Sequence, residues 1–272
     1  MSAQGANDSP TPDPEVNALV AELLREVRAI LGPHLVGMYL EGSLARGGFD
    51  AASDIDFVVV TDEEVDEATY RALQAMHDRI AMRDTPWAVQ LEGSYLSRAA
   101  LRRHGPVPLS HPNIERGRGA RLKMARHVED WIIHRYNLRE GGIVLAGPPP
   151  ATLIDPVAPD ELRRAVRDVL RGWWALMRDD AAPLRPRGYQ SYAVLSLCRI
   201  LYTLAHGAVA SKEEAARWAQ ATLDPRWAPL IADAWEGRWR PNGEASPEDV
   251  RETQAFICYA LERAGMDGTP GG

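Results

Sequence analysis

Hydrophobic residues in the first hundred positions form two kinds of pattern, helical stripes and short apolar runs. Apolar side chains spaced three and four residues apart indicate helices, whereas short apolar runs bounded by glycine and polar residues indicate strands. The pattern predicts a helix over 14–30, strands over 36–40 and 54–61, a helix over 63–83 and an extended segment over 87–97. The order α-β-turn-β-α-β is typical of a small domain in which helices cover a sheet.

The pattern changes after residue 108, because helical stripes then follow one another between breaks rich in proline and glycine. The stripes predict helices over 121–140, 159–177, 189–205, 211–223, 225–235 and 247–264. We therefore expect an α+β protein with two domains, an α/β domain over 14–108 followed by a helical bundle over 109–265. A length of 272 residues is enough for two domains that each bury a core.

The formal net charge is −7, and it is unevenly distributed along the chain. Residues 1–100 contain seven basic and 17 acidic side chains, whereas residues 101–272 contain 24 basic and 21 acidic ones. This split predicts two domains with different electrostatic roles. A protein that coats nucleic acid needs a basic surface, so we expect no nucleic-acid partner.

Nothing in the sequence indicates passage into or across a membrane. No apolar run approaches the roughly 18 residues that span a bilayer, and the start lacks the basic and apolar segments of a signal peptide. Cys198 and Cys258, the only cysteines, lie in predicted helices, which indicates free thiols in a reducing compartment. We therefore expect a cytoplasmic protein, and we expect it to be a monomer.

The clearest chemical signal is a set of carboxylates next to a Gly-Ser pair. Gly42-Ser43 follows the first predicted strand, and Asp54 and Asp56 begin the second. Side chains at i and i+2 of a strand share a face, so the two carboxylates stand side by side. They repel each other unless a cation lies between them, and Mg²⁺ prefers one or two carboxylates plus substrate phosphates. Glu92 joins them if the third extended segment pairs beside the second strand.

Each part of this signal is common when it occurs alone. Asp-x-Asp is usually solvated, and Gly-Ser is commoner still. Glycine and serine at the end of a strand also allow a backbone N–H and a hydroxyl to approach a phosphate closely. The joint pattern of strand, Gly-Ser, ten residues, Asp-x-Asp on an apolar strand and a later carboxylate favours a site for a metal ion and phosphate.

This joint pattern resembles the active-site motif of the nucleotidyltransferase superfamily, whose catalytic domain is a polymerase-beta-like palm. The rear of the chain resembles the helical C-terminal domain of the streptomycin and spectinomycin adenylyltransferases. The second resemblance is carried by the segments Leu145 to Pro148, Leu195 to Tyr202 and Ser211 to Ala219. Together the two resemblances cover residues 15–265.

The resemblance implies a role for each residue of the front motif. Asp54 and Asp56 match the ligands of Mg²⁺. Glu92 matches the catalytic carboxylate, which is a further metal ligand and the proposed general base. Gly42 and Ser43 match the turn that binds the phosphates of ATP.

Two cations of the helical half, Arg199 and Lys212, match residues that reach the triphosphate in this family. Residues 211–214, Ser-Lys-Glu-Glu, have the Ser-x-x-Glu form of a capping box, which places Lys212 in the first turn of a helix. The helix dipole disfavours a cation there unless an anion shares the site. The structural alternatives are a solvated surface lysine and, for Arg199, an ion pair that ties helices together.

The resemblance implies an aminoglycoside O-adenylyltransferase, which transfers AMP from ATP to a hydroxyl of a cationic drug and so gives antibiotic resistance. Such enzymes are expected to hold the drug with acidic residues just before the helix predicted over 189–205. Direct alignment there meets Arg185, Tyr189 and Gln190 instead. Asp179 and Asp180 lie slightly further back and are the candidate replacements.

Two alternatives stay open. The first is a nucleotidyltransferase with a different acceptor, either another small metabolite, a protein hydroxyl or an RNA end. The second is a nucleotide-binding partner protein without catalysis. The acidic front disfavours an RNA end, which needs cations that contact phosphate. The intact carboxylates disfavour the protein without catalysis.

Overall fold

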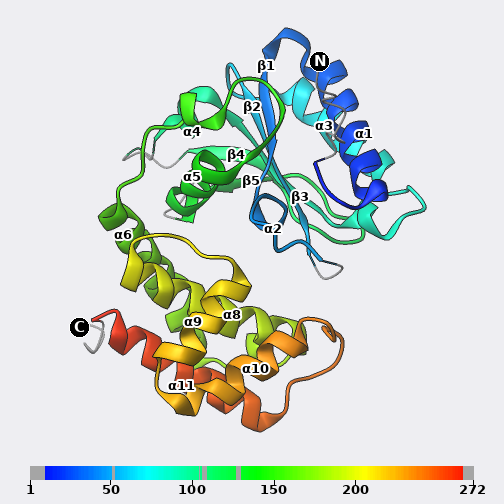
Figure 1. Ribbon diagram of the computed structural model, residues 1–272. Coiled ribbons are helices and arrows are strands. Elements are labelled where there is room, and N and C mark those ends of the chain that lie inside the picture. Colours follow the sequence, from blue (N-terminus) through cyan, green and yellow to red (C-terminus); the bar gives the residue numbers. More distant parts are fainter. Residues whose placement is uncertain (1–9, 51–52, 104, 106–108, 127–129, 266–272) are drawn as a thin grey trace, which may run out of the picture. The chain divides into compact units, whose positions relative to one another are not determined.

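The chain divides into two compact units, of which the first comprises residues 1–128 and 137–156 and the second residues 129–136 and 157–272. Figure 1 shows both in the computed structural model, which describes residues 10–50, 53–103, 105, 109–126 and 130–265. The first unit contains a mixed sheet with helices, and the second unit is helical.

The first unit is built on one six-stranded sheet, in the order β5-β4-β3-β2-β1-β6. Its strands are β1 (Leu35–Leu40), β2 (Ile55–Thr61), β3 (Leu91–Ser97), β4 (Ser110–Ile114), β5 (Lys123–Arg126) and β6 (Ile143–Ala146). Its helices are α1 (Pro14–Leu31), α2 (Gly42–Ala45), α3 (Glu67–Ile80) and α4 (Arg98–Arg102), and α5 (Asp130–Gly141) contains residues of both units. Strands β2 and β3 are parallel and joined through α3, whereas the other neighbouring strands are antiparallel.

Helix α1 shows how local sequence sets an element and its packing. The Asp13 side chain accepts hydrogen bonds from the first backbone N–H groups, and Gly32, with φ of +51°, ends the helix. One face of α1 is apolar at helical spacing and packs into the same core as α3 and the sheet. The buried residues of that face are Val16, Leu19, Val20, Leu23, Val27 and Leu31.

Strand β2 is almost continuously apolar because both faces of the sheet are covered at this strand. Ile55, Phe57 and Val59 belong to the core that α1 and α3 complete. Alternation along the strand turns Asp56 to the opposite face. Glu92 is the register partner of Asp56 on β3, so its side chain belongs to that same opposite face.

Gly93 provides the space that Phe57 occupies. A Cβ atom on Gly93 would lie 2.5 Å from Cε1 and Cζ of the Phe57 ring, which is closer than side chains approach one another. The His77 ring stacks on Phe57 with 5.9 Å between the ring centroids, and its Nε2 lies 2.7 Å from the Tyr95 hydroxyl. Burial lowers the pKa of His77 to about 4 and raises the pKa of Tyr95, so both side chains are neutral at pH 7.

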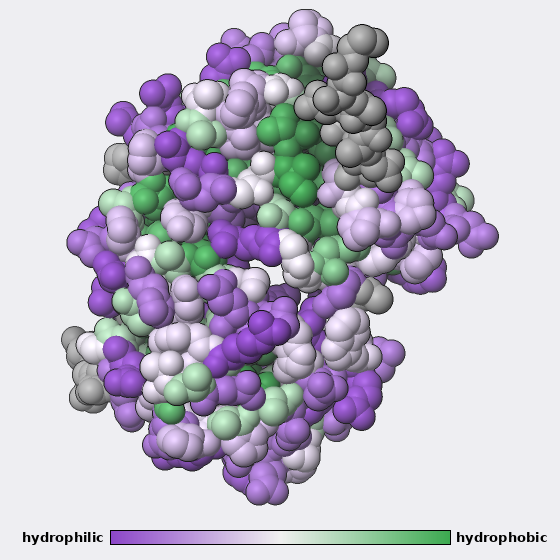
Figure 2. All heavy atoms as spheres, viewed as in Figure 1, coloured by the Kyte–Doolittle hydropathy of each residue, from purple (hydrophilic) through white to green (hydrophobic). Residues whose placement is uncertain are grey.

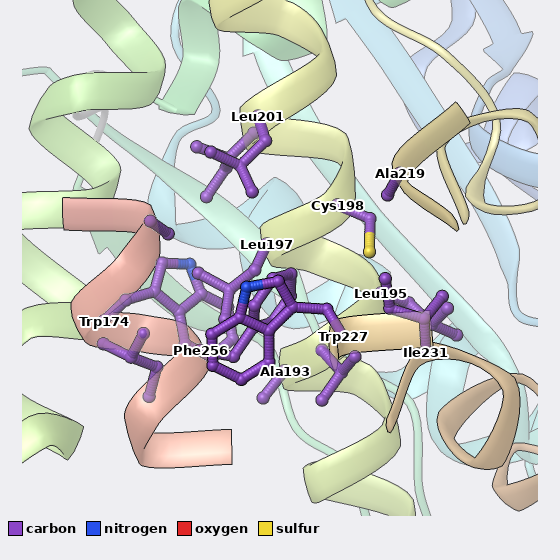
Figure 3. Close-up of a cluster of buried hydrophobic side chains, with 14 of the residues drawn as sticks. Trp174, Ala193, Leu195, Leu197, Cys198, Leu201, Ala219, Trp227, Ile231 and Phe256 are labelled. Carbon is purple, nitrogen blue, oxygen red and sulfur yellow. The ribbon is translucent and has the colours of Figure 1, made fainter. Parts of the chain in front are cut away.

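The second unit packs its helices around α8. Its helices are α6 (Pro159–Val169), α7 (Ala175–Asp179), α8 (Arg187–His206), α9 (Lys212–Thr222), α10 (Ala228–Gly237) and α11 (Pro247–Arg263), and a π-helical segment, η4 (Leu170–Trp174), joins α6 to α7. Helix α8 contacts α6, α9, α10 and α11. Apolar side chains of α8 meet Trp174, Trp227 and Phe256 in the core (Figure 3), and the last two rings lie 5.0 Å apart.

Several features differ from the prediction. The helix expected over 121–140 is wrong in its first half, because 123–126 form the edge strand β5, which pairs with β4. Sheet pairing here overrides a helical pattern of sequence. The helix expected over 63–83 begins later, at the Asp66 N-cap. The first unit also continues past residue 108, because β4, β5 and β6 join its sheet; residues 106–108 at the expected boundary lie outside the described residues.

Hydrophilic residues cover most of the face shown in Figure 2. Within the described residues, no helix combines the length and the apolarity needed to cross a bilayer. Both cysteines are free, and burial raises the pKa of the Cys198 thiol to about 12. Cys258 is only partly buried.

Candidate active site

Asp54, Asp56 and Glu92 lie together at the start of β2 and β3. Each offers one carboxylate oxygen, these oxygens lie within 4.8 Å of one another, and all three residues are half-buried. The pairing of β2 with β3 places Asp56 beside Glu92, and Asp54 lies two positions before Asp56. A 2.9 Å hydrogen bond from the Ile55 N–H to the Gln90 carbonyl fixes this end of the two strands.

Gly42 lies directly against the Asp56 carboxylate. The backbone N–H of Glu41 donates to the Asp56 carbonyl over 3.0 Å, which holds the end of β1 beside β2. Gly42 has φ of +66°, and a Cβ atom on it would lie 1.9 Å from Asp56 Oδ2. Gly42 and Ser43 begin the one-turn helix α2, and the Ser43 carbonyl accepts from the Gly48 N–H over 3.1 Å. Glycine is therefore required here for both its backbone conformation and its lack of a side chain.

Arg116 contributes a positive charge to this cluster. It forms an ion pair with Asp54, and the side chains of Arg116 and Asp54 are 49% and 23% exposed. The next residue, Gly117, donates its N–H to the Val89 carbonyl over 2.8 Å, so the backbone after Arg116 is tied to the segment that leads into β3.

The site has the donor chemistry of a hard divalent cation. Its three carboxylates offer only oxygen ligands, which suit Mg²⁺ better than a softer metal. Because Gly42 has no side chain, Oδ2 of Asp56 can lie close to the backbone that follows β1. Asp54, Asp56 and Glu92 are therefore the residues that could hold such an ion.

Each half of the chain matches the profile of a known protein domain. The nucleotidyltransferase domain profile matches residues 20–97, and the profile of the aminoglycoside adenylyltransferase C-terminal domain matches residues 152–263. An aminoglycoside (3'') (9) adenylyltransferase of Escherichia coli is 27% identical over 255 residues, which are 90% of this chain and 93% of that protein. The chain belongs to the aminoglycoside adenylyltransferase-like family of the nucleotidyltransferase superfamily.

Two further proteins resemble this adenylyltransferase-like protein. A spectinomycin 9-adenylyltransferase of Staphylococcus aureus is 25% identical over 231 residues, covering 79% of this chain and 82% of its own. A spectinomycin adenyltransferase from Enterococcus faecialis, solved with ATP and spectinomycin, aligns with a TM-score of 0.70 at 17% identity over 91% of this chain and 98% of its own. The predicted α+β fold is confirmed, and the protein is an enzyme of the nucleotidyltransferase kind.

The two predicted cations of the adenylyltransferase-like protein lie in its second unit. Arg199, on α8, donates from Nε to the Ala210 carbonyl over 3.2 Å. Lys212 is the first residue of α9, and the Ser211 hydroxyl caps that helix by accepting from the Glu214 N–H over 3.1 Å. Arg199 therefore holds the segment that directly precedes Lys212. Contact of either cation with a triphosphate stays a prediction.

Arg116 is a site residue that the sequence did not indicate. It follows β4, whose sequence Ser-His-Pro-Asn-Ile contains a proline and little alternation of apolar residues, so no strand was predicted there. Without β4 there is no reason to place Arg116 near Asp54. The only sequence signal is an arginine before a glycine-rich turn, which is common at surfaces.

Proposed function

We propose that this protein transfers AMP from ATP to a hydroxyl of a small acceptor and releases pyrophosphate. The acceptor that we propose is an aminoglycoside of the streptomycin and spectinomycin group, so that the reaction gives antibiotic resistance. The observation that carries the proposal is the group of three carboxylates beside Gly42 at the start of β2 and β3. The adenylyltransferase names of the relatives support the choice of ATP and of the drug.

Asp54, Asp56 and Glu92 are the residues that we propose as Mg²⁺ ligands. When bound, the ion would polarise the phosphate oxygens and offset the charge that develops as pyrophosphate leaves. The half-buried position of all three carboxylates suits this role, since burial strengthens their interaction with a cation.

Other steps of the proposed reaction, proton transfer and phosphate binding, are assigned to residues of the chain. Glu92 accepts the proton of the acceptor hydroxyl, which is typically worth about 10²- to 10⁴-fold in rate. Gly42 and Ser43 present backbone N–H groups and a hydroxyl to the phosphates at the start of α2. Arg199 and Lys212 bind the triphosphate and neutralise the charge of the leaving pyrophosphate.

A different small acceptor is the second candidate, and the second unit provides its support. Gln190 is fully buried and donates to Thr253 over 2.9 Å, so it does not replace an acidic drug ligand. The Arg178 guanidinium pairs with Asp179 and holds the pKa of that carboxyl below its ordinary value. The Tyr189 hydroxyl accepts from the indole N–H of the exposed Trp173 over 3.1 Å. An acceptor with a flat apolar face suits these residues better than a densely cationic one.

Pyrophosphate release measured with MgATP tests both candidates. The acceptors are streptomycin, spectinomycin, other aminoglycosides and neutral hydroxyl compounds with apolar rings. Glu92→Gln and Asp54→Asn should abolish the release that depends on the acceptor. Glu115→Gln is the matched control, because Glu115 is an exposed carboxylate of the same unit that pairs with Lys123.

The outcomes separate the candidates. Release that only aminoglycosides stimulate supports the first, and release that only neutral compounds stimulate supports the second. ATP binding without turnover on any acceptor contradicts both. Full activity of Glu92→Gln would contradict the assignment of the general base while leaving the acceptor assignment intact.

A further inference from the structure

The register of the sheet brings Arg116 to the carboxylate cluster. Strand β4 runs antiparallel to β3 with Ile114 opposite Gly93, so the residues after Ile114 pass the start of β3, where Glu92 lies. The side chain of Asn113 anchors this pairing, because it donates to the Gly93 carbonyl over 3.1 Å and to a neighbouring hydroxyl over 3.0 Å. The position of Arg116 is therefore set by the same sheet that positions the carboxylates.

The pairing between Arg116 and Asp54 is built to be reversible. Arg116 is half exposed, so its side chain can turn into solvent without opening a core. It is followed by Gly117 and Gly119, which have φ of +131° and +71°, and a Cβ atom on either glycine would meet none of the described residues within 4 Å. An exposed ion pair contributes little net free energy, so a divalent ion that binds three carboxylates can displace it.

We propose that Arg116 is a built-in counter-ion that competes with the divalent metal ion for Asp54. In the metal-free protein its guanidinium offsets the repulsion among Asp54, Asp56 and Glu92. When the metal ion binds, Arg116 leaves Asp54, so the presence of Arg116 lowers metal affinity and stabilises the metal-free site. The inference rests on the proposed function, because it takes the three carboxylates as the metal ligands.

Titration with Mn²⁺ alone, followed by electron paramagnetic resonance in the absence of ATP and acceptor, tests this role. We expect Arg116→Gln to bind Mn²⁺ about three- to fivefold more tightly than the unmodified protein, the effect of removing one exposed ion pair. Arg118→Gln removes the same charge from an exposed position two residues further on, so its affinity should stay near that of the unmodified protein. Arg116→Lys, which keeps the charge but not the planar fork, should fall between the two.

Thermal unfolding provides a second readout that needs no bound metal. In EDTA, Arg116→Gln should unfold at a lower temperature than Arg118→Gln, because its three carboxylates have lost a counter-ion. Mn²⁺ should raise the unfolding temperature of Arg116→Gln more than that of Arg118→Gln. If Arg116→Gln does not fold, the same comparison is made with Arg116→Lys.

The results distinguish this inference from the proposed function. If Arg116→Gln and Arg118→Gln bind Mn²⁺ with equal affinity, or Arg116→Gln binds it more weakly, the proposed competition between Arg116 and the metal ion is contradicted. The proposal that the three carboxylates bind the metal ion is then still supported. If neither the unmodified protein nor Arg116→Gln binds Mn²⁺, both the competition and the metal site are overturned. Absence of turnover with aminoglycosides, alongside tighter Mn²⁺ binding by Arg116→Gln, overturns only the proposed acceptor.

Discussion

Gly42→Ala is the substitution that most sharply tests how the backbone supports the carboxylate cluster. Gly42 has φ of +66°, a conformation that costs an alanine about 1–2 kcal/mol. The added Cβ atom would also lie 1.9 Å from Asp56 Oδ2, whereas ordinary contacts begin at 3.4 Å. The carboxylate must therefore move by roughly 1.5 Å, the difference between these two distances. A displacement of about 1 Å in a catalytic group can lower the rate by about 10²-fold.

Gly47→Ala is the matched control. Gly47 has φ of +69°, almost the same as Gly42, but a Cβ atom on it would meet none of the described residues within 4 Å. Urea unfolding should therefore show a loss of about 1–2 kcal/mol in the free energy of unfolding for Gly47→Ala and at least as much for Gly42→Ala.

Pyrophosphate release with MgATP and an active acceptor separates the two variants. We expect Gly47→Ala to keep most of its rate and Gly42→Ala to lose about 10²-fold. Mn²⁺ binding should fall in the same order, since Asp56 is a proposed ligand. Equal rates in the two variants would refute the reasoning, because the contact with Asp56 is the feature that distinguishes them.

The remaining predictions concern acid stability, capping and nucleotide binding. Burial gives His77 a pKa of about 4 in the folded protein, against 6.5 for the free side chain. The contribution of His77 to stability is therefore full above pH 6.5, and it decreases by up to about 3 kcal/mol as the pH falls toward 4. Urea unfolding of His77→Gln at a series of pH values should lack this pH dependence. Ser246 caps α11 by accepting from the Asp249 N–H over 3.1 Å, so Ser246→Ala should cost about 1 kcal/mol in urea unfolding, and Ser246→Asp should restore it. Lys212→Gln should raise the KM for ATP about tenfold, whereas Arg217→Gln, on the exposed face of α9, should leave the KM unchanged. Equal KM values in the two variants would contradict the proposal that Lys212 binds the nucleotide.

The candidate metal site was predictable from sequence where its signal depends on residues close together in the chain. Asp54 and Asp56 are two residues apart at the head of an apolar strand, and alternation alone puts them on one face. Glu92 was predictable only on the condition that β3 pairs beside β2, which the parallel register now satisfies. The Ser211 cap of α9 was predictable because capping depends on a few adjacent residues.

The features that sequence did not indicate depend on contacts between distant segments. The edge strand β5 has a helical pattern of apolar residues, and it is extended because β4 lies beside it. The one-turn helix α2, which precedes the expected turn, has no signal in the sequence pattern; within it Gly42 fits against Asp56, and the Ser43 carbonyl accepts from the Gly48 N–H. These contacts have no counterpart in the spacing of residues along the chain.

The fit of Phe57 over Gly93 also protects the enzyme against forming an inactive fold. A slip of one residue between β2 and β3 would put Glu92 or Ser94 under the Phe57 ring, where a Cβ atom would lie only 2.5 Å from ring carbons. The same slip would turn the Glu92 carboxylate away from Asp56 and so separate the three carboxylates of the proposed metal site. The packing of Phe57 and the grouping of the three carboxylates therefore depend on the same register of β2 and β3, and a sheet mispaired by one residue would lack both.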